Sequence, residues 1–411
     1  YPNTNFINKL IIDFKKYLKN RFINSDINFN TSLAYMLYYR FQPLDENKIV
    51  FSNFGGNSYG CNPKYITEEI LRRKLPYKLV WLFRDTNDET KLKVFPEQIE
   101  IKRFHTQNSL KELANAKLWI DNIHKAAYFK NGLKKRKNQC YIQTWHGSLG
   151  IKKIDTDAKC FNNTVWLESA ILDSLNADYL LTNSVFEEQI LPKSLHFKNK
   201  LIKSGHPRND VFFKDNIEII AKLKKYYNIN DDTKIVLYAP SFRDTGILDC
   251  YGIDSDMLIN VLNTNWGGDW VFMARFHPRM AYLKEFLMSK NNKIIDATEY
   301  PDVQEVLVAA DILITDYSSC IFDFMLSRKP AFIYAEDIEK YKQYRGFYYP
   351  LESTPFPIAQ NNEELVNNIE SFDYENYRQK VEMFLEDKGC YEDGHAAERV
   401  VDLIEEIMSK K

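Results

Sequence analysis

The chain has 411 residues, of which 45% are hydrophobic and 27% charged, and its formal net charge at pH 7 is −1. This length is sufficient for about two or three domains with sizeable cores, and a nearly neutral charge argues against bulk nucleic-acid binding, so any anion site must be local. No uninterrupted apolar run approaches the roughly 18 residues of a membrane span, so we expect a protein that is soluble or attached at a membrane surface.

Residues 1–45 are expected to form an N-terminal helical segment. Apolar side chains between Phe6 and Phe22 recur on one face, while Arg21 and several lysines lie off that face. A basic amphipathic helix of this kind usually packs on a domain with its charged face in water. Docking on an anionic membrane surface is the other interpretation. A second helix is expected at about residues 31–41.

From Lys48 onward, short apolar runs alternate with helical stretches, which predicts an α/β protein whose parallel sheets are covered on both faces. The alternation restarts after a polar helix at about residues 216–227. We therefore predict two Rossmann-like lobes, residues 46–210 and 211–390, and a C-terminal helix within 391–411 that could cross back to the first lobe. The expected strands are 49–51, 79–83, 118–120, 141–142, 179–181 and 201–202 in the first lobe, and 234–239, 270–274, 293–295, 312–314 and 331–334 in the second.

Polar turns follow the expected strands at five places in the sequence. Ligands of doubly wound sheets bind beyond the carboxyl ends of the strands, and these turns place His, Arg or hydroxyl side chains there. A lone His after a strand is usually a structural residue, but five such turns rich in cations and neutral donors favour a phosphate-bearing ligand. The turns are Gln143–Ser148 with Lys152 and Lys153 behind it, Ser204–Asp210, Tyr238–Asp244, Arg275–Pro278 and Thr315–Ser319.

The last of these turns lies within a strand, turn and helix that together span 312–330. Free backbone N–H groups at the start of the helix, with the hydroxyls of Ser318 and Ser319 beside them, can bind an anion without a metal ion. The alternative is that the two serines only cap the helix. Asp316 is interpreted as a turn or cap residue rather than a metal ligand, because no second carboxylate stands near it at ligand spacing.

Several other classes of site are disfavoured by the sequence. It has neither the G-x-G-x-x-G fingerprint of a nicotinamide enzyme nor the G-x-x-x-x-G-K-[ST] loop of an NTPase. The six cysteines are scattered without a C-x-x-C pair, which fits reduced thiols in a cytoplasmic protein and provides no metal-site spacing. We therefore expect neither a metal nor a cofactor.

The polar motifs, taken as an ordered series, resemble those of the CDP-glycerol glycerophosphotransferase family, the teichoic-acid and capsule polyol-phosphate transferases. The resemblance runs from about Ser52 to the C-terminus and is specific as a set, although no single motif is. The motifs are T-W-H-G at 144–147 followed by Lys152 and Lys153, G-x-P-R-N-D at 205–210, Y-A-P-S-F-R-D at 238–244, R-x-H-P at 275–278, T-D-Y-S-S at 315–319 and D-G-x-A at 393–396.

This resemblance implies a GT-B-like fold with the nucleotide held mainly by the C-terminal lobe and the acceptor approaching through the cleft. It also implies transfer of glycerol phosphate or ribitol phosphate from CDP-glycerol or CDP-ribitol to a hydroxyl of a teichoic-acid-like or capsular polymer, with release of CMP. The acceptor would be a polyol-phosphate or glycan chain, lipid-linked or free. The basic N-terminal helices are similar to the membrane-docking segments of family members, which implies a peripheral protein on the inner face of the cytoplasmic membrane.

Together, the residues and the resemblance support one assignment of roles. His146 is expected to be the general base, because imidazole titrates near neutral pH and follows a strand of the first lobe. His277, with Arg275, is expected to neutralise the pyrophosphate or to protonate the leaving phosphate, and the roles of the two histidines could be exchanged. The phosphates are assigned to Lys152, Arg208, Arg243, Ser318 and Ser319.

Two other functions stay open at this stage. A nucleotide-sugar glycosyltransferase of the GT-B fold would use the same phosphate turns with a sugar pocket. A non-catalytic scaffold of polysaccharide assembly is the alternative outside the enzymes. The sequence does not choose between glycerol and ribitol, between primer and polymer acceptors, or between one transfer and many.

Overall fold

The computed structural model describes residues 38–125, 128–129, 132–160, 164–243, 251–277, 280, 291 and 293–410. The expected basic helix between Phe6 and Phe22 lies outside these residues. Residues 31–37 of the second expected helix also lie outside them. The described chain begins with the short 3-10 helix η1 (Tyr39–Phe41) and then enters the first sheet. None of its helices is long and apolar enough to cross a membrane.

In the described part of the chain, seven parallel strands form the sheet of the first lobe, in the order β3-β2-β1-β4-β5-β6-β7. Strand β1 pairs with β2 on one side and β4 on the other, and apolar side chains of alternate residues enter the cores on the two faces. The strands are β1 (Asp45–Ser52), β2 (Lys78–Phe83), β3 (Glu100–Arg103), β4 (Ala116–Asp121), β5 (Cys140–Gln143), β6 (Tyr179–Thr182) and β7 (Lys200–Lys203).

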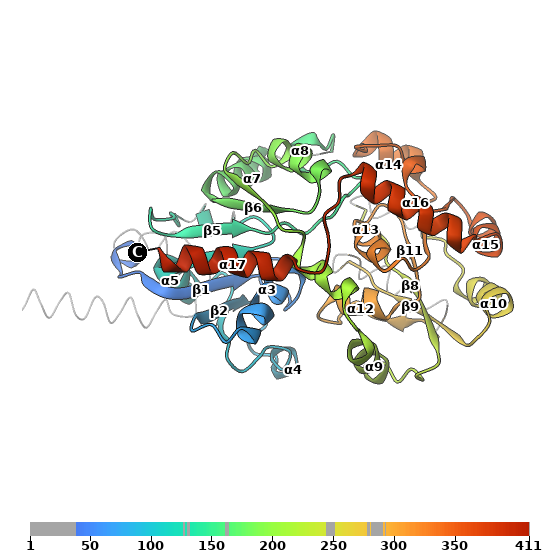
Figure 1. Cartoon of the computed structure of the whole chain (residues 1–411), viewed down its shortest axis with the longest axis horizontal. Coiled ribbons are helices and arrows are strands. Elements are labelled where there is room, and N and C mark those ends of the chain that lie inside the picture. Colours follow the sequence, from blue (N-terminus) through green and yellow to red (C-terminus); the bar gives the residue numbers. More distant parts are fainter. Residues whose placement is uncertain are drawn as a thin grey trace, which may run out of the picture.

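Helices cover both faces of this sheet (Figure 1). The amphipathic face of α3 (Cys61–Arg72) places Ile66 and Ile70 against the strands, and the capping box of Thr106 with Ser109 begins α5 (Gln107–Asn115). The remaining helical segments of the lobe are α4 (Glu89–Leu92), η2 (Asp155–Asp157), α7 (Thr164–Asn176), α8 (Val185–Ser194) and η3 (Pro207–Phe213).

The second lobe repeats this architecture with six described parallel strands in the order β10-β9-β8-β11-β12-β13. The strands are β8 (Lys234–Tyr238), β9 (Trp270–Ala274), β10 (Ile295–Asp296), β11 (Ile312–Thr315), β12 (Ala331–Tyr334) and β13 (Ile358–Ala359). The helices are α9 (Ile217–Tyr226), α10 (Ser255–Trp266), α12 (Val303–Ala309), α13 (Cys320–Phe324), η5 (Met325–Ser327), α14 (Ile338–Tyr344), η6 (Leu351–Ser353), α15 (Asn362–Glu370) and α16 (Tyr374–Asp387).

The last helix, α17 (Ala396–Ser409), lies along the first lobe, as the red ribbon of Figure 1 shows. Its residues Val400 and Ile404 are buried in the same core as β1 and β2. Asp210 of η3 accepts hydrogen bonds from the backbone N–H groups of Ala396 and Ala397, at 2.9 and 2.8 Å, and so satisfies the start of the helix. This contact explains structurally why the motifs at 205–210 and 393–396 occur together.

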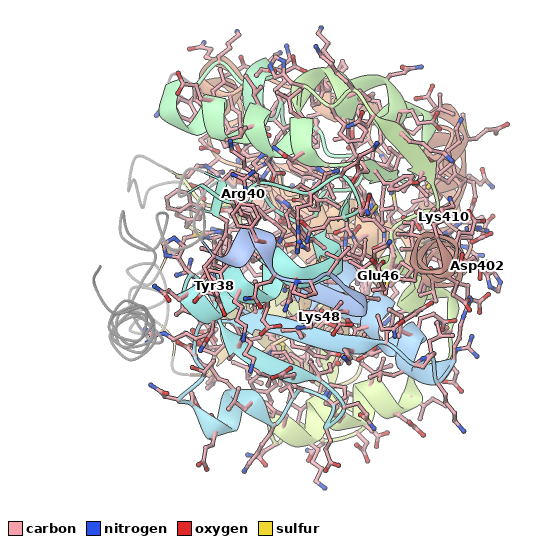
Figure 2. All side chains as sticks on the ribbon, turned by 90° about the vertical axis from the view of Figure 1, so that its left-hand side faces the viewer. Tyr38, Arg40, Glu46, Lys48, Asp402 and Lys410 are labelled. Atoms are coloured by element: carbon pink, nitrogen blue, oxygen red, sulfur yellow. The ribbon has the colours of Figure 1, made fainter. Side chains whose placement is uncertain are left out.

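The opposite end of α17 is fastened to the first sheet by a buried lysine. Lys117 of β4 donates a hydrogen bond to the carbonyl of Lys410, at 2.9 Å, and forms an ion pair with Glu46 at 2.6 Å. Figure 2 views this end of the first lobe, with Lys410, Glu46 and Asp402 labelled. The last carbonyl groups of a helix have no partner within the helix, and Lys117 supplies one.

The two parallel sheets confirm the predicted α/β fold class, and two strands were not foreseen. Strand β3 reads Glu-Ile-Lys-Arg, because it is an edge strand without a fully buried side chain. Strand β13 has only two residues, too few for a hydrophobic pattern. Between the lobes, the buried Lys64 of α3 forms ion pairs with Asp302 and Glu305 at the start of α12, each at 2.7 Å.

Candidate active site between the lobes

His146 lies in the turn after β5, and a single hydrogen bond determines which of its ring nitrogens is basic. Its Nδ1 is 2.8 Å from the backbone carbonyl oxygen of Asn122, which follows β4. A carbonyl can only accept, so Nδ1 carries the proton and the lone pair is on Nε2. The rings of Trp145 and Phe54 lie beside the imidazole, with centroids 4.4 and 5.4 Å away. Burial lowers the pKa of His146 to about 4, which keeps the ring neutral at pH 7.

The His146 turn approaches the second lobe through two glycines. A Cβ atom placed on Gly147 would lie 3.9 Å from Oγ of Ser319, and one on Gly150 would lie 3.6 Å from Cβ of Ser319. Beyond the turn, the N–H of Lys153 donates to the carbonyl of Gly346, at 3.1 Å. The His146 turn of the first lobe and the Thr315–Ser319 turn of the second lobe, predicted separately, therefore meet at the boundary between the lobes.

Ser318 and Ser319 precede α13, and neither hydroxyl caps this helix firmly. Ser319 is the N-cap residue and makes no side-chain capping hydrogen bond, and Ser318 Oγ lies 3.5 Å from the N–H of Cys320. Side-chain caps normally satisfy such N–H groups. The N–H groups of Ile321 and Phe322 already donate to backbone carbonyl groups, at 3.3 and 3.1 Å. An anion could therefore use the two hydroxyls and the weakly bonded N–H of Cys320.

Lys152 lies just behind the His146 turn, half-buried and next to Arg345 from the end of α14. No carboxylate forms an ion pair with either cation in the part of the chain that the structure describes. The guanidinium of Arg345 donates from Nε to the carbonyl of Lys153, at 2.9 Å. Burial, and then the charge of Arg345, lower the pKa of Lys152 to about 8. Two neighbouring cations without a counter-ion make this boundary attractive to an anionic ligand.

Arg243 is buried between two carboxylates of the second lobe. Its guanidinium forms ion pairs with Asp316 and Asp337, both at 2.8 Å, and lies over the ring of Tyr317 with 4.9 Å to the centroid. Asp316 also accepts hydrogen bonds from the N–H of Ser241, at 2.9 and 3.0 Å. Arg243 and Asp316 therefore hold the turns after β8 and β11 together, and all of Asp316's described contacts are with donors of the protein itself.

Arg208 of η3 is buried and connects the His146 turn with α13. It donates from Nε and Nη2 to the carboxylate of Asp323, at 3.0 and 3.1 Å, and from Nη2 to Oγ of Ser148, at 2.8 Å. Its Nη1 has no hydrogen-bond partner among the described residues. The side chain thus links the His146 turn to α13, the helix that follows the Thr315–Ser319 turn.

Arg275 and His277 follow β9 on the second lobe. Arg275 donates from Nη1 to the carbonyl groups of Ala297 and Tyr300, at 2.5 and 2.8 Å, and burial lowers its pKa. The His277 ring is exposed beside Phe242, with centroids 5.6 Å apart. No hydrogen bond or ion pair within the described chain joins either residue to the His146 turn.

Three residues of this site were not identified from the sequence. Asn122 acts through a backbone carbonyl, which carries no sequence signal, and Asp323 meets Arg208 across 115 positions of the chain. Arg345 does not belong to a turn that follows a strand, so the sequence pattern did not indicate it. Its position before Gly346 brings it close to the Lys152 segment only when the two lobes are packed together. No cluster of three or more His, Cys, Asp or Glu suited to a metal ion occurs in the described stretches.

The profile of the family described as CDP-glycerol:poly(glycerophosphate) glycerophosphotransferase matches residues 33–406 of the chain. The chain belongs to this family. The match includes every motif that suggested the resemblance and all the residues of the site described above.

Relatives of the glycerophosphotransferase family agree with this assignment. The chain is 30% identical to the teichoic acid poly(glycerol phosphate) polymerase of Bacillus spizizenii over 88% of its own length and 92% of the relative's. It is 28% identical to the polymerase of the same name from Bacillus subtilis, over 96% of its own length and 53% of the relative's. The chain thus spans about half the length of that Bacillus subtilis relative.

A solved structure is also similar over nearly its whole length. It is the wall teichoic acid polymerase TagF, in a variant with one histidine replaced by asparagine and soaked with CDPG. The TM-score is 0.80 and the sequence identity 27%, covering 100% of this chain and 99% of that one. The likeness supports the two-lobed arrangement found here.

Proposed function

We propose that this chain transfers glycerol phosphate or ribitol phosphate from a CDP-linked donor to a hydroxyl of a teichoic-acid-like or capsular polymer and releases CMP. One observation carries the proposal: a neutral His146, with its lone pair on Nε2, lies in the turn whose Gly147 and Gly150 approach Ser319 of the second lobe. Family membership supports the proposed class of donor, and the contacts support the roles proposed for the residues of this chain.

The proposed reaction is an in-line displacement at phosphorus. Nε2 of His146 takes the proton of the acceptor hydroxyl as its oxygen attacks the phosphorus that bears the polyol, and the bond to the CMP oxygen breaks. Charge on the phosphoryl oxygens is met by the hydroxyls of Ser318 and Ser319 and the N–H of Cys320 at the start of α13, and by the cations Lys152 and Arg345. His277, with Arg275, is assigned to the leaving phosphate.

In the proposal, Arg208 and Arg243 chiefly hold the turns of the site in place. Both were expected to bind phosphates, and both already have carboxylate partners in the protein. We assign Arg243 to holding the two second-lobe turns and Arg208 to holding the His146 turn against α13. The buried Nη1 nitrogen of Arg208 has no partner among the described residues and keeps its two N–H groups for a ligand.

The acceptor and the place of action are further parts of the proposal. We propose a polyol-phosphate or glycan acceptor, lipid-linked, and attachment to the inner face of the cytoplasmic membrane through the basic residues before position 38. Binding to anionic vesicles should exceed binding to neutral ones and weaken with salt. Equal, salt-insensitive binding to both would leave no membrane role for this segment.

The deciding experiment measures CMP release from CDP-glycerol and from CDP-ribitol, each with a polyol-phosphate acceptor and with EDTA present. We expect turnover with at least one donor and no dependence on a divalent ion, because the protein already supplies the positive charge. His277→Ala should lower turnover by about 100-fold. Release of nucleotide from a UDP-sugar instead would make the chain a glycosyltransferase, and no release from any donor would make it a non-catalytic scaffold.

A further inference from the structure

A second histidine, His124, lies close to the site and has no part in the proposed chemistry. It is buried, and its two ring nitrogens face two carboxylates: Nδ1 is 3.3 Å from Asp173 on α7, and Nε2 is 3.3 Å from Asp155 in η2. A carboxylate only accepts at neutral pH, so both nitrogens carry protons and the ring is an imidazolium. Hydrogen bonds to the two carboxylates outweigh burial and raise the pKa of His124 to about 10.

This imidazolium belongs to the short segment that presents the Asn122 carbonyl to His146. Asp121 accepts from the N–H of Asn122, at 2.8 Å, and Asp173 accepts from the N–H of Lys125, at 2.7 Å. The side chain of Asn122 donates to Asn53 Oδ1, at 2.6 Å. The segment is therefore held at both ends, and His124 ties its middle to α7 and to the loop beyond Lys152.

We propose that His124, in its charged form, is a positioning residue for His146: it fixes the carbonyl that accepts the hydrogen bond from Nδ1 of the base, and its charge, like burial, opposes protonation of the base. The inference rests on the proposed role of His146 as general base. A stabilising role alone is a weak explanation, because a buried ion triad adds little net stability compared with apolar residues of similar volume. The three side chains also do not form a group suited to a metal ion.

The charges around His146 determine the direction in which the charge of His124 shifts the pKa of His146. Arg208 and His124 are the cations that face the imidazole, and both lower its pKa, whereas Asp155 is the facing carboxylate and raises it. Removing the charge of His124 should therefore raise the pKa of His146. A base that is partly protonated near neutral pH is partly inactive, so the acid limb of the activity profile should move to higher pH.

The test is a pH titration of the histidine rings by NMR in the full chain without substrate, using 13C-labelled histidine. The chain has seven histidines, and the His146 signal is identified by its loss in His146→Gln. In the parent we expect the Nδ1–H tautomer and a depressed pKa. In His124→Gln we expect a mixture of tautomers and a raised pKa, with kcat about 10-fold lower and KM for the donor little changed.

Two further variants separate positioning from general destabilisation. Glu112→Gln removes another buried ion pair of the first lobe, with Lys48 at the far end of β1, and should leave the tautomer and pKa of His146 unchanged. His124→Lys keeps the positive charge on a flexible side chain without the two fixed donors of the imidazolium, and should keep the pKa of His146 low while losing the fixed tautomer. Parent-like tautomer and pKa in a folded His124→Gln would overturn the proposal.

If His124→Gln does not fold, Asp155→Asn carries the test, because it removes one attachment and leaves the buried Asp173 in place. A mixed tautomer of His146 in this variant supports the proposal, and the parent tautomer contradicts it. These NMR readings need no turnover. A chain that releases no CMP and still shows the expected tautomer would therefore refute the proposed function and leave the positioning of His146 standing.

Discussion

Two pairs of cations line the boundary between the lobes, and they differ in their partners. Arg208 and Arg243 are buried, and each lies within hydrogen-bond distance of a carboxylate of its own protein. Lys152 and Arg345 have no such carboxylate among the described residues, and burial depresses the pKa of the lysine. A cation with an internal counter-ion holds parts of the fold together, whereas one without gains its counter-ion when an anionic ligand binds. Positive charge near a cleft is therefore a poor guide to ligand binding until its pairing is known.

The paired cations should matter most for stability. Arg243→Ala leaves the buried Asp316 and the half-buried Asp337 without their cation, and we expect a loss of about 3–5 kcal/mol in the free energy of unfolding. Urea denaturation followed by circular dichroism measures it. Lys152→Ala is the matched control from the unpaired set, with an expected change within about 1 kcal/mol. Similar losses in the two variants would remove the distinction between the pairs.

The unpaired cations should matter most for binding. Lys152→Ala and Arg345→Ala should each weaken binding of CDP by about 1–3 kcal/mol, the scale of a lost charge-assisted hydrogen bond. Calorimetric titration checks this, with Lys159→Ala as the control because Lys159 is an exposed cation of the same loop. An equal effect of all three variants would indicate general electrostatic attraction and no specific pair.

The depressed pKa of Lys152 predicts the pH dependence of that binding. The free protein loses the charge of Lys152 as the pH rises through about 8, and a bound phosphate favours the charged form. Affinity for CDP should thus be nearly complete at about pH 7 and fall up to about tenfold by pH 9, where roughly nine-tenths of the free lysine is neutral. Lys152→Arg stays charged and should bind CDP with little change over this range. A parent profile as flat as that of the variant would place Lys152 outside the donor site.

The smallest effect is expected at the start of α13. Replacing Ser318 and Ser319 together by Ala should weaken CDP binding by about 1 kcal/mol, because two hydroxyl donors are lost while the N–H of Cys320 and the neighbouring cations remain. Stability should change by less than the roughly 1 kcal/mol of an ordinary cap, since the hydroxyls do not cap α13 firmly. Reduced stability with unchanged affinity would show that the serines serve the helix alone.

The sequence predicted those elements of the fold whose buried side chains produce a regular pattern of apolar residues. The central strands are runs of apolar residues and were found at the correct places. Strand β3 was missed because an edge strand without a fully buried side chain, such as Glu100–Arg103, keeps polar residues. The C-terminal helix was predicted for the same reason, because its apolar face packs into a core of the first lobe.

The site was only partly visible in the sequence, for a different physical reason. His146, Lys152 and Ser319 stand in or just behind turns that follow strands, where ligands of such sheets bind. The partners that decide what each side chain does come from distant positions: the carbonyl of Asn122, and Asp323, which lies 115 positions from Arg208. Without those partners, a bracing arginine and a ligand-binding arginine look the same.

The proposed function depends on His146 as the base of a polyol-phosphate transfer, and one comparison of two proteins tests this role. CMP release from CDP-glycerol and CDP-ribitol is measured for the parent and for His146→Ala, together with CDP affinity and the free energy of unfolding. We expect the variant to lose about 100-fold or more in turnover, while affinity and stability stay close to those of the parent. Turnover near the parent rate in a folded His146→Ala would contradict the account.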